Sequence, residues 1–589
     1  MKRRRFIQAG LHAAAQGAAF GVSRTIATGT GAFTGLLAGT VVPALIPASA
    51  WADTTAPVPR AEIVRVLAEG APNSLDPHGN GFNRESFSAF ANVYDCLVGF
   101  DRTAIVTAPG GASNGHAKEA YRYDYHHLTG QLATSFESLD GGAAWRFHLR
   151  RDAQFHSGNP VTADAVKWSL DRAVSLPASQ RQLASGSLTQ PSQFVVEDAY
   201  TLRIDLPRAD RYALPNLALS YAAILDAALL RAHANATDPW ATAWLRDNAA
   251  GGGAYQVAAF QSGQRIDYVR YDGWKSGRLP TIRRAIAQAV PDASSRMASL
   301  ARGDADIVLQ LAPREFDMAG RLPGVATLSI PLTNTFRFLA FNTQLKPFDD
   351  VRVRQAIAYA LPYNDLFQGV ARGHGKPLFS EAGSGSASGS GSESGSAPSS
   401  ALTPVWPQVY PYGTNLPRAR ALLREAGLPN GFSTTLTLNV SDAAVAEPAA
   451  LLIQHALAAI GIVVSIEKAP GAQWGALQTQ KAMPFFIDWS SAWFNDPDYF
   501  YRIFFEGDWR WNFSSFHNAA LTKLTDAARW ETNQTHYDGL MRSAAAIVID
   551  QAPLLPLWLP AFDVAMRDDL RGFTYYIHGQ VDFRTLHRG

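Results

Sequence analysis

Alternating apolar and polar residues predict an interleaved order of strands and helices. Residues 145–149 alternate between apolar and polar side chains, as in a strand with one buried face. A turn-forming run occupies 157–160, and apolar residues then recur at helical spacing over 166–173, with Thr162 in place to cap the helix. This stretch therefore predicts a strand, a turn and a helix.

A second stretch repeats the pattern and closes it with another strand. Residues 436–440 alternate, an apolar helix is expected around 449–460, and a strand is expected at 462–466. Between the two stretches, Pro417 and Gly427 mark the start and the end of a short helix. The order strand, helix, strand predicts an α/β fold.

Length and composition indicate a chain of several domains without a large net charge to attract a charged partner. The chain has 589 residues, 47% of them hydrophobic, which is enough for several domains. With 52 basic against 50 acidic residues the net charge is only +2, which argues against nucleic acid as a partner. Cys96 is the only cysteine, so the chain cannot form an internal disulfide.

The N-terminus predicts export through the twin-arginine route. Basic residues at 2–5 precede Phe6 and a Gly/Ala/Thr-rich apolar stretch, and small residues around 48–52 suit a cleavage site after Ala52. The alternative is an uncleaved membrane anchor, because residues 25–52 carry no charge. We expect residues 1–52 to be a signal peptide and the mature chain to be a soluble periplasmic protein.

Residues 381–400 are rich in Gly and Ser and hold few apolar side chains. Such a segment cannot bury enough surface to offset the entropy of ordering it, so we expect a flexible surface insertion without chemistry of its own.

Three familiar catalytic motifs are missing from the sequence. It has no H-E-x-x-H, G-x-x-x-x-G-K-[ST] or C-x-x-C pattern, whereas a G-x-S-x-G match does occur, at 111–115. The tightest histidine pair is His126-His127, which we expect in an exposed polar turn, because neighbouring strand residues point to opposite faces and rarely share one metal ion. We therefore predict neither an enzyme nor a cofactor or metal site.

Four blocks of the sequence carry a specific resemblance. They are N-S-L-D-P-H at 73–78, the long run 145–172, the run 341–356 with F-N-T and P-F-D-D-V-R, and A-P-L-L-P-L at 552–557. In these blocks the chain resembles the family 5 extracellular solute-binding proteins, the peptide receptors of ABC importers.

The resemblance implies two α/β lobes joined by a hinge, with an additional third domain, and a ligand enclosed between the lobes. It predicts lobe I from 53–92, 208–325 and 556–589, the additional domain at 93–207, and lobe II at 326–555 with the Gly/Ser insertion inside it. Aromatic residues, 11% of the chain, suit a closing cleft because they give a large contact area at low entropic cost.

The aromatic segment 488–500 is the expected ligand contact. In peptide-binding relatives the tryptophan that matches Trp489 lines the pocket, and an aspartate three residues later pairs with the α-ammonium of the peptide. Here that position is Ala492, which puts free-amine recognition in doubt, because a buried ammonium without a partner costs several kcal/mol. Asp488 is a displaced candidate for that carboxylate, with a structural salt bridge as its alternative. The remaining ligand-binding candidates of the segment are Ser490, Ser491 and Trp493.

Three residues outside this segment complete the expected site. Arg337 lies in an otherwise apolar strand and must be paired, either with a protein carboxylate, which we favour, or with an anionic group of the ligand. Phe82 and Asn83 lie in a loop where relatives approach the ligand from lobe I.

The leading hypothesis is a monomeric periplasmic receptor that captures a peptide or peptide-like solute and delivers it to ABC permease subunits in the inner membrane. A saccharide, metal chelate, haem or blocked peptide is the alternative cargo, because the fold does not determine the ligand. A periplasmic hydrolase would need a nucleophile and base within reach, and the sequence offers no recognisable pair. A third possibility is a receptor or chaperone whose loaded form contacts a partner other than the permease.

Overall fold

The structure of the protein is a computed structural model that describes residues 58–105, 119–332, 334–377, 380–381, 409–576 and 579–589. The expected signal peptide, its cleavage site and nearly all of the 381–400 insertion lie outside these residues. Val58–Gly589 forms one unit, which is described by itself. No helix in the described part is both long and apolar enough to cross a bilayer.

A seven-stranded mixed sheet is the centre of the first lobe, called lobe I. Strand β1 (Ile63–Ala68) is central and pairs in parallel with β10 (Arg284–Ala289) on one side and β11 (Ile307–Val308) on the other. The sheet also contains β8 (Tyr255–Gln261), β9 (Arg265–Arg270), β12 (Val325–Pro331) and β20 (Ala561–Arg567). Helices α7 (Ala293–Arg302) and α8 (Pro313–Ala319) pack beside β11 and β20. Distant parts of the chain therefore share this core.

The predicted strand and helix around 145–173 are confirmed. Strand β5 (Ala144–Leu149) buries Phe147 and Leu149, and α2 (Ala163–Ser175) begins after Thr162, whose side chain accepts a hydrogen bond from the backbone N–H of Ala165. The sheet of this third domain has the order β4, β5, β7, β6, with β4 (Ala133–Leu139), β6 (Phe194–Asp198) and β7 (Thr201–Asp205), and α3 (Pro177–Ala184) follows α2.

A buried ion pair connects two of the blocks that carry the resemblance. Arg172 on α2 donates from Nη1 and Nη2 to the two carboxylate oxygens of Asp76, at 2.8 and 2.6 Å, and both side chains are buried. Such a pair is stable in the interior because both charges are matched and hydrogen-bonded. It holds the third domain against the loop that follows β1.

The histidine pair lies on a strand, so the predicted turn is wrong. His126 and His127 belong to β3 (Tyr121–Gly130), which pairs with β2 (Val98–Ala104) and β22 (Thr574–Tyr575). The pairing with β2 shifts register near these histidines, and this bulge exposes both of them. In the described part of the chain no group of three metal-ligating side chains occurs.

The second lobe, called lobe II, is built on a five-stranded sheet. Its order is β17 (Val463–Ala469), β16 (Ser433–Asn439), β18 (Phe485–Ser491), β13 (Thr335–Phe341) and β19 (Leu554–Trp558). Helix α12 (Ala443–Ala458) connects the parallel strands β16 and β17, which confirms the predicted strand–helix–strand unit. The first strand ends before Val440, because the Asn439 side chain accepts from Ser441 and turns the chain there.

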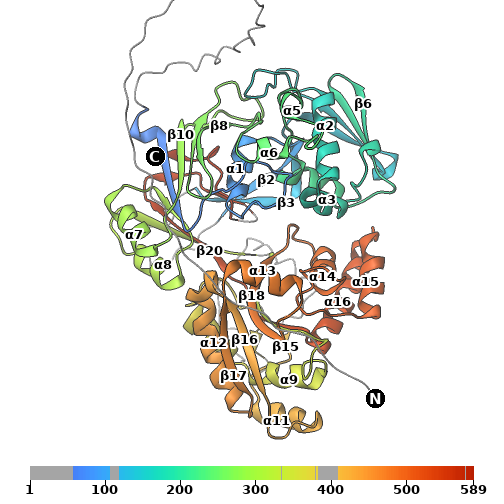
Figure 1. Ribbon diagram of the computed structural model, residues 1–589, viewed down its shortest axis with the longest axis vertical. Coiled ribbons are helices and arrows are strands. Elements are labelled where there is room, and N and C mark those ends of the chain that lie inside the picture. Colours follow the sequence, from blue (N-terminus) through green and yellow to red (C-terminus); the bar gives the residue numbers. More distant parts are fainter. Residues whose placement is uncertain (1–57, 106–118, 333, 378–379, 382–408, 577–578) are drawn as a thin grey trace, which may run out of the picture. The chain divides into compact units, whose positions relative to one another are not determined.

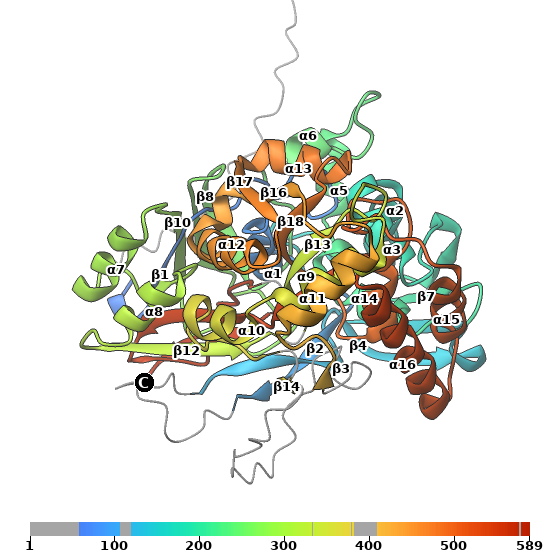
Figure 2. The same cartoon turned by 90° about the horizontal axis from the view of Figure 1, so that it is seen from below.

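Further helices cover this sheet and extend lobe II to one side (Figures 1 and 2). Figure 2 shows α9 (Val351–Ala360) and α11 (Leu416–Glu425) side by side, and α11 begins with Pro417 inside its first turn, as predicted. The other helices are α13 (Gly471–Thr479), α14 (Pro497–Phe505), α15 (Ala519–Arg529) and α16 (Gln534–Gln551).

The chain crosses between the lobes twice, at neighbouring points. Strand β12 of lobe I ends at Pro331 and β13 of lobe II begins at Thr335, while β19 ends at Trp558 and β20 begins at Ala561. The backbone N–H of Leu332 donates to the carbonyl of Pro560 at 2.9 Å, which ties the two crossings together. Two short adjacent connections are the geometry of a hinge.

Candidate ligand-binding site

A cavity of about 300 Å³ lies beside the hinge and is lined from both lobes. Lobe I contributes Arg84, Glu85, Ser88, Leu309, Phe562, Asp563 and Tyr575, and lobe II contributes Arg337, His374, Asp442, Trp489, Ser491 and Trp558, among others. Ligand sites of this kind combine apolar and aromatic walls with a few fixed polar groups. The composition of this lining fits that description.

Strand β18 directs alternate side chains into the cavity. Trp489 and Ser491 line it, and the hydroxyl of Ser491 shares a hydrogen bond of 2.6 Å with that of Thr335. Arg337 is the register partner of Trp489 on β13, so both point to the cavity face of the sheet.

Arg337 forms an internal ion pair. Its Nη1 and Nη2 donate to the two carboxylate oxygens of Asp442 at 2.5 and 3.0 Å, and its guanidinium lies 5.5 Å from the ring centroid of Trp558. The structure therefore contains the protein carboxylate that we favoured as its partner, at the wall of the cavity.

Asp488 and Ser490 face away from the cavity. The carboxylate of Asp488 accepts from Gln478 Nε2 at 2.7 Å and from the backbone N–H of Trp489 at 2.8 Å. Burial raises the pKa of Asp488 to about 7. Ser490 is buried on the same face, opposite Phe336. The structure does not bring either residue to the cavity.

The position after Ser491 is buried in the core. Ala492 is only 1% exposed, and its backbone N–H donates to the carbonyl of Asn334 at 2.8 Å. Trp493 turns toward lobe I and packs edge-on against Phe87 and Tyr221, with ring centroids 4.9 and 5.1 Å apart. Trp493 therefore contributes to the contact between the lobes rather than to the wall of this cavity.

Phe82 and Asn83 shape the loop before α1 (Ser86–Val93). Phe82 packs edge-on against Phe87 and Phe90, with ring centroids 5.1 and 5.3 Å apart. The Asn83 side chain accepts from the backbone N–H of Ser86 at 3.1 Å and donates to the carbonyl of Ala71 at 2.8 Å. Both side chains fix the loop, and neither lines the cavity.

The adjacent residue, Arg84, was not predicted and is the one that reaches the cavity. Its guanidinium lies 4.1 Å from the ring centroid of Trp489, which is a cation–π contact across the two lobes. The sequence signal was a pair of charged residues, Arg84 and Glu85, at the end of the loop that holds Phe82 and Asn83.

A larger hollow of about 880 Å³ lies between β2, β3 and the C-terminal segment. Its central acid, Asp582, already accepts from the hydroxyls of Tyr123 and Tyr576, at 3.1 and 2.9 Å, and pairs with Arg584 at 2.9 Å. Because it takes almost no lining from lobe II, closure of the lobes would not enclose a solute there.

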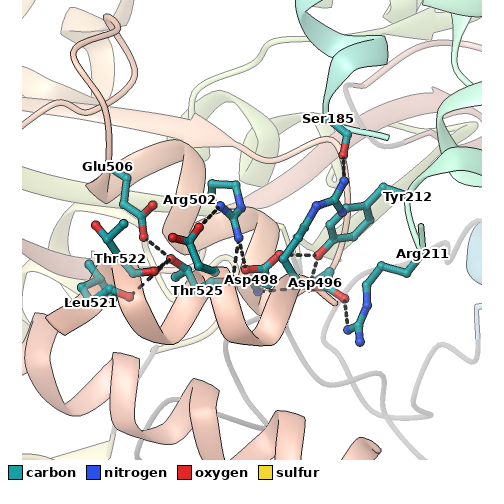
Figure 3. A network of polar contacts seen from close by, with 12 residues as sticks. Ser185, Arg211, Tyr212, Asp496, Asp498, Arg502, Glu506, Leu521, Thr522 and Thr525 are labelled. Atoms are coloured by element: carbon teal, nitrogen blue, oxygen red, sulfur yellow. Dashed lines mark hydrogen bonds and ion pairs between the residues drawn. The ribbon is translucent and has the colours of Figure 1, made fainter. Parts of the chain in front are cut away.

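Away from the cavity, a polar network connects the lobes (Figure 3). Asp496 is the N-cap of α14, and its carboxylate accepts from the hydroxyls of Tyr212 and Tyr537, each at 2.5 Å. Burial raises the pKa of the adjacent Asp498 to about 6, although Arg502 lies 3.1 Å away. Asp496 and Asp498 thus belong to the N-terminus of α14 and have a structural role.

A solute-sized cavity enclosed by two hinged α/β lobes defines a two-lobed binding protein. Residues 127–512 match the model of the bacterial extracellular solute-binding proteins, family 5. The chain belongs to this family.

Known relatives agree with this assignment. The chain is 26% identical to the probable D,D-dipeptide-binding periplasmic protein DdpA of Escherichia coli (strain K12), over 76% of this chain and 82% of the relative. It is 28% identical to heme-binding protein A of Haemophilus influenzae, over 78% and 85% of the two chains. The fold matches that of the periplasmic binding protein DppA of Helicobacter pylori in complex with the peptide STSA, with a TM-score of 0.70, 21% identity and coverage of 89% and 98%.

Proposed function

We propose that this protein is the receptor of an ABC importer, which captures a peptide or peptide-like solute between its lobes and delivers it to permease subunits in the inner membrane. The observation that carries the proposal is the cavity beside the hinge, where Arg84 of lobe I stacks on Trp489 of lobe II. A solute between these residues would touch both lobes and favour their closed arrangement.

We propose four ligand-contacting residues, three of which the sequence predicted and one of which, Arg84, it did not. Trp489, Ser491 and Arg337 line the cavity together with Arg84. The other sequence candidates lie outside the cavity lining and hold the loop and strands that carry these contacts: Phe82, Asn83, Asp488, Ser490 and Trp493. We further propose export through the twin-arginine route and a monomeric state in the periplasm.

The role is one of binding, as it is for the named relatives. A non-peptide cargo is the second candidate, because Ala492 is buried where peptide-binding relatives are expected to hold the ammonium-binding aspartate. A haem-binding relative, at 28% identity, makes that alternative concrete.

The test is native mass spectrometry of the protein purified from its own periplasm, followed by identification of the released compound. Peptides recovered with unchanged mass would support the proposal. A saccharide or metal chelate would contradict the peptide assignment and leave the receptor role, while a compound converted during incubation with the protein would contradict the binding role. Loss of uptake of the same compound in a deletion strain would support the importer.

A further inference from the structure

Most charged groups on the cavity wall are paired. Arg337 is bound to Asp442. His374 lies between two carboxylates, with Nδ1 at 2.8 Å from Asp563 and Nε2 at 3.1 Å from Asp317. Although burial opposes it, these carboxylates raise the pKa of His374.

Arg84 is the cation of this wall that has no ion pair in the described part of the chain, and its neighbour Glu85 is an acid without one. The guanidinium of Arg84 lies over the face of Trp489, 4.1 Å from the ring centroid, and within the described part of the chain its side chain forms no hydrogen bond or ion pair. The neighbouring Glu85 accepts from the neutral amide of Gln310 at 3.1 Å and forms no ion pair with Arg84. The five N–H donors of the guanidinium therefore remain available.

The surroundings of Arg84 partly desolvate its charge, and within the described residues no hydrogen-bond acceptor compensates for this cost. The side chain keeps accessible surface inside the cavity, and desolvation there lowers its pKa from the ordinary value for arginine. A guanidinium in a partly desolvated cavity gains most from a bound anion, because the attraction is weakly screened there. The contact with Trp489 places the guanidinium over the indole ring, and a guanidinium can offer two parallel N–H donors to one oxyanion.

We propose that Arg84 binds an anionic group of the cargo, a carboxylate or a similar small oxyanion, while this group lies against Trp489. The inference rests on the proposed function, since it names the chemical class of the captured solute. It also complements Ala492: the segment lacks the expected carboxylate for an ammonium, whereas lobe I presents a free cation. The cargo is thus recognised first by its negative end.

Two experiments test the proposal. In the first, compounds retained by the wild-type protein and by Arg84→Gln are released after purification from the periplasm and identified by mass spectrometry. In the second, calorimetry measures binding of a pool of synthetic tripeptides with free carboxylates and of the same pool with C-terminal amides. Arg84→Lys is included because it keeps the charge without the fork, and Arg302→Gln is the control, since Arg302 is exposed and pairs with Asp304 on the surface. Thermal melting checks that every variant is folded.

We expect the retained compounds to carry a carboxylate or another oxyanion, and the wild-type protein to bind the free-acid pool about 10- to 100-fold more tightly than the amide pool. Arg84→Gln should abolish that preference, Arg84→Lys should keep part of it, and Arg302→Gln should behave as the wild type. Equal binding of both pools would overturn the role of Arg84 and leave peptide capture intact. An anionic cargo that is not a peptide would overturn only the peptide assignment. A neutral or purely cationic cargo, or a protein that neither retains a compound nor binds either pool, would overturn the inference.

Discussion

Asp488 is a carboxyl group held inside lobe II, behind the strand that carries Trp489. Its two oxygens accept one hydrogen bond each, from Gln478 and from the backbone, and no cation in the described part of the chain forms an ion pair with it. Desolvation therefore dominates, and the pKa of Asp488 rises to about 7. Ionising this buried carboxyl lowers the free energy of unfolding, so the protein loses stability when the pH rises.

The sign of this effect follows from linkage. A carboxyl whose folded pKa lies above its unfolded pKa binds more protons when folded, so stability falls as the pH rises from about 4 to about 7. We expect Asp488→Asn, which cannot ionise, to gain stability over the wild type across that window, by about 2–4 kcal/mol at pH 8. Urea unfolding of both proteins at pH 5 and pH 8 measures the difference.

Asp304→Asn is the matched control, because Asp304 is exposed beside Arg302. It should shift stability little and equally at both pH values. Parallel pH profiles for the wild type and Asp488→Asn would show that Asp488 ionises normally in the folded protein.

At this scale the sequence predicted some contacts and missed the central one. Trp489 and Ser491 could be predicted because a motif and the period of a strand place them on one face. Arg84 could not, because its partner Trp489 is remote in the chain and meets it only across the two lobes. Ala492 was noticed as a departure, but its burial depends on packing that no local pattern reports.

At the scale of elements, a second buried ion pair fastens α15 to Asp210, in the segment of lobe I that follows the third domain. Arg529 at the end of α15 donates from Nη2 to Asp210 at 2.5 Å and also to the carbonyl of Ser185. Its guanidinium lies 4.5 Å from the ring centroid of Tyr212. Both members of the pair are buried, so neither can be replaced singly without leaving an unmatched charge.

We expect Arg529→Gln to lower the free energy of unfolding by about 3–5 kcal/mol, because Asp210 remains buried without its cation. The double variant Asp210→Asn, Arg529→Gln should lose less than the sum of the two single variants, as expected for groups in direct contact. Chemical denaturation of the four proteins measures the coupling. Additive losses would mean that the pair contributes nothing as a pair.

The helices and strands that could be predicted are those with a strong local period. Strand β5, helix α2 and the unit β16–α12–β17 all follow from alternation or helical spacing. The histidines on β3 were assigned to a turn because a bulge gives a strand the same exposed, polar pattern. Short strands such as β11, with two residues, have no period to detect.

At the scale of the whole chain, the resemblance predicted the two lobes, but the division into domains stays a prediction. The two crossings lie between Pro331 and Thr335 and between Trp558 and Ala561, so we propose lobe boundaries at these points. The sequence blocks identify the family and therefore the fold. They do not show at which residue the chain leaves the sheet of one lobe and enters the sheet of the other.

The contacts of Asp496 connect the lobes independently of the cavity. The hydroxyls of Tyr212 and Tyr537 donate to its carboxylate, and Arg211 lies 3.8 Å from it. Asp496→Asn keeps the cap of α14, because asparagine is an equally good N-cap, but removes the charge that strengthens these bonds. We expect this variant to weaken the closed arrangement by about 1–3 kcal/mol.

A weaker closed arrangement has two measurable consequences. Without cargo, Asp496→Asn should have a larger radius of gyration in small-angle X-ray scattering than the wild type, and the difference should vanish when the free-acid tripeptide pool saturates the protein. The apparent Kd should rise by at most about 10-fold for each 1.4 kcal/mol lost, because a smaller fraction of the protein is ready to bind. Asp526→Asn serves as the control, since the exposed carboxylate of Asp526 pairs with Arg502 of the same lobe, at 3.3 Å. Identical scattering for the wild type and Asp496→Asn, with an unchanged Kd, would assign closure to the cargo contacts at Arg84 and Trp489 alone.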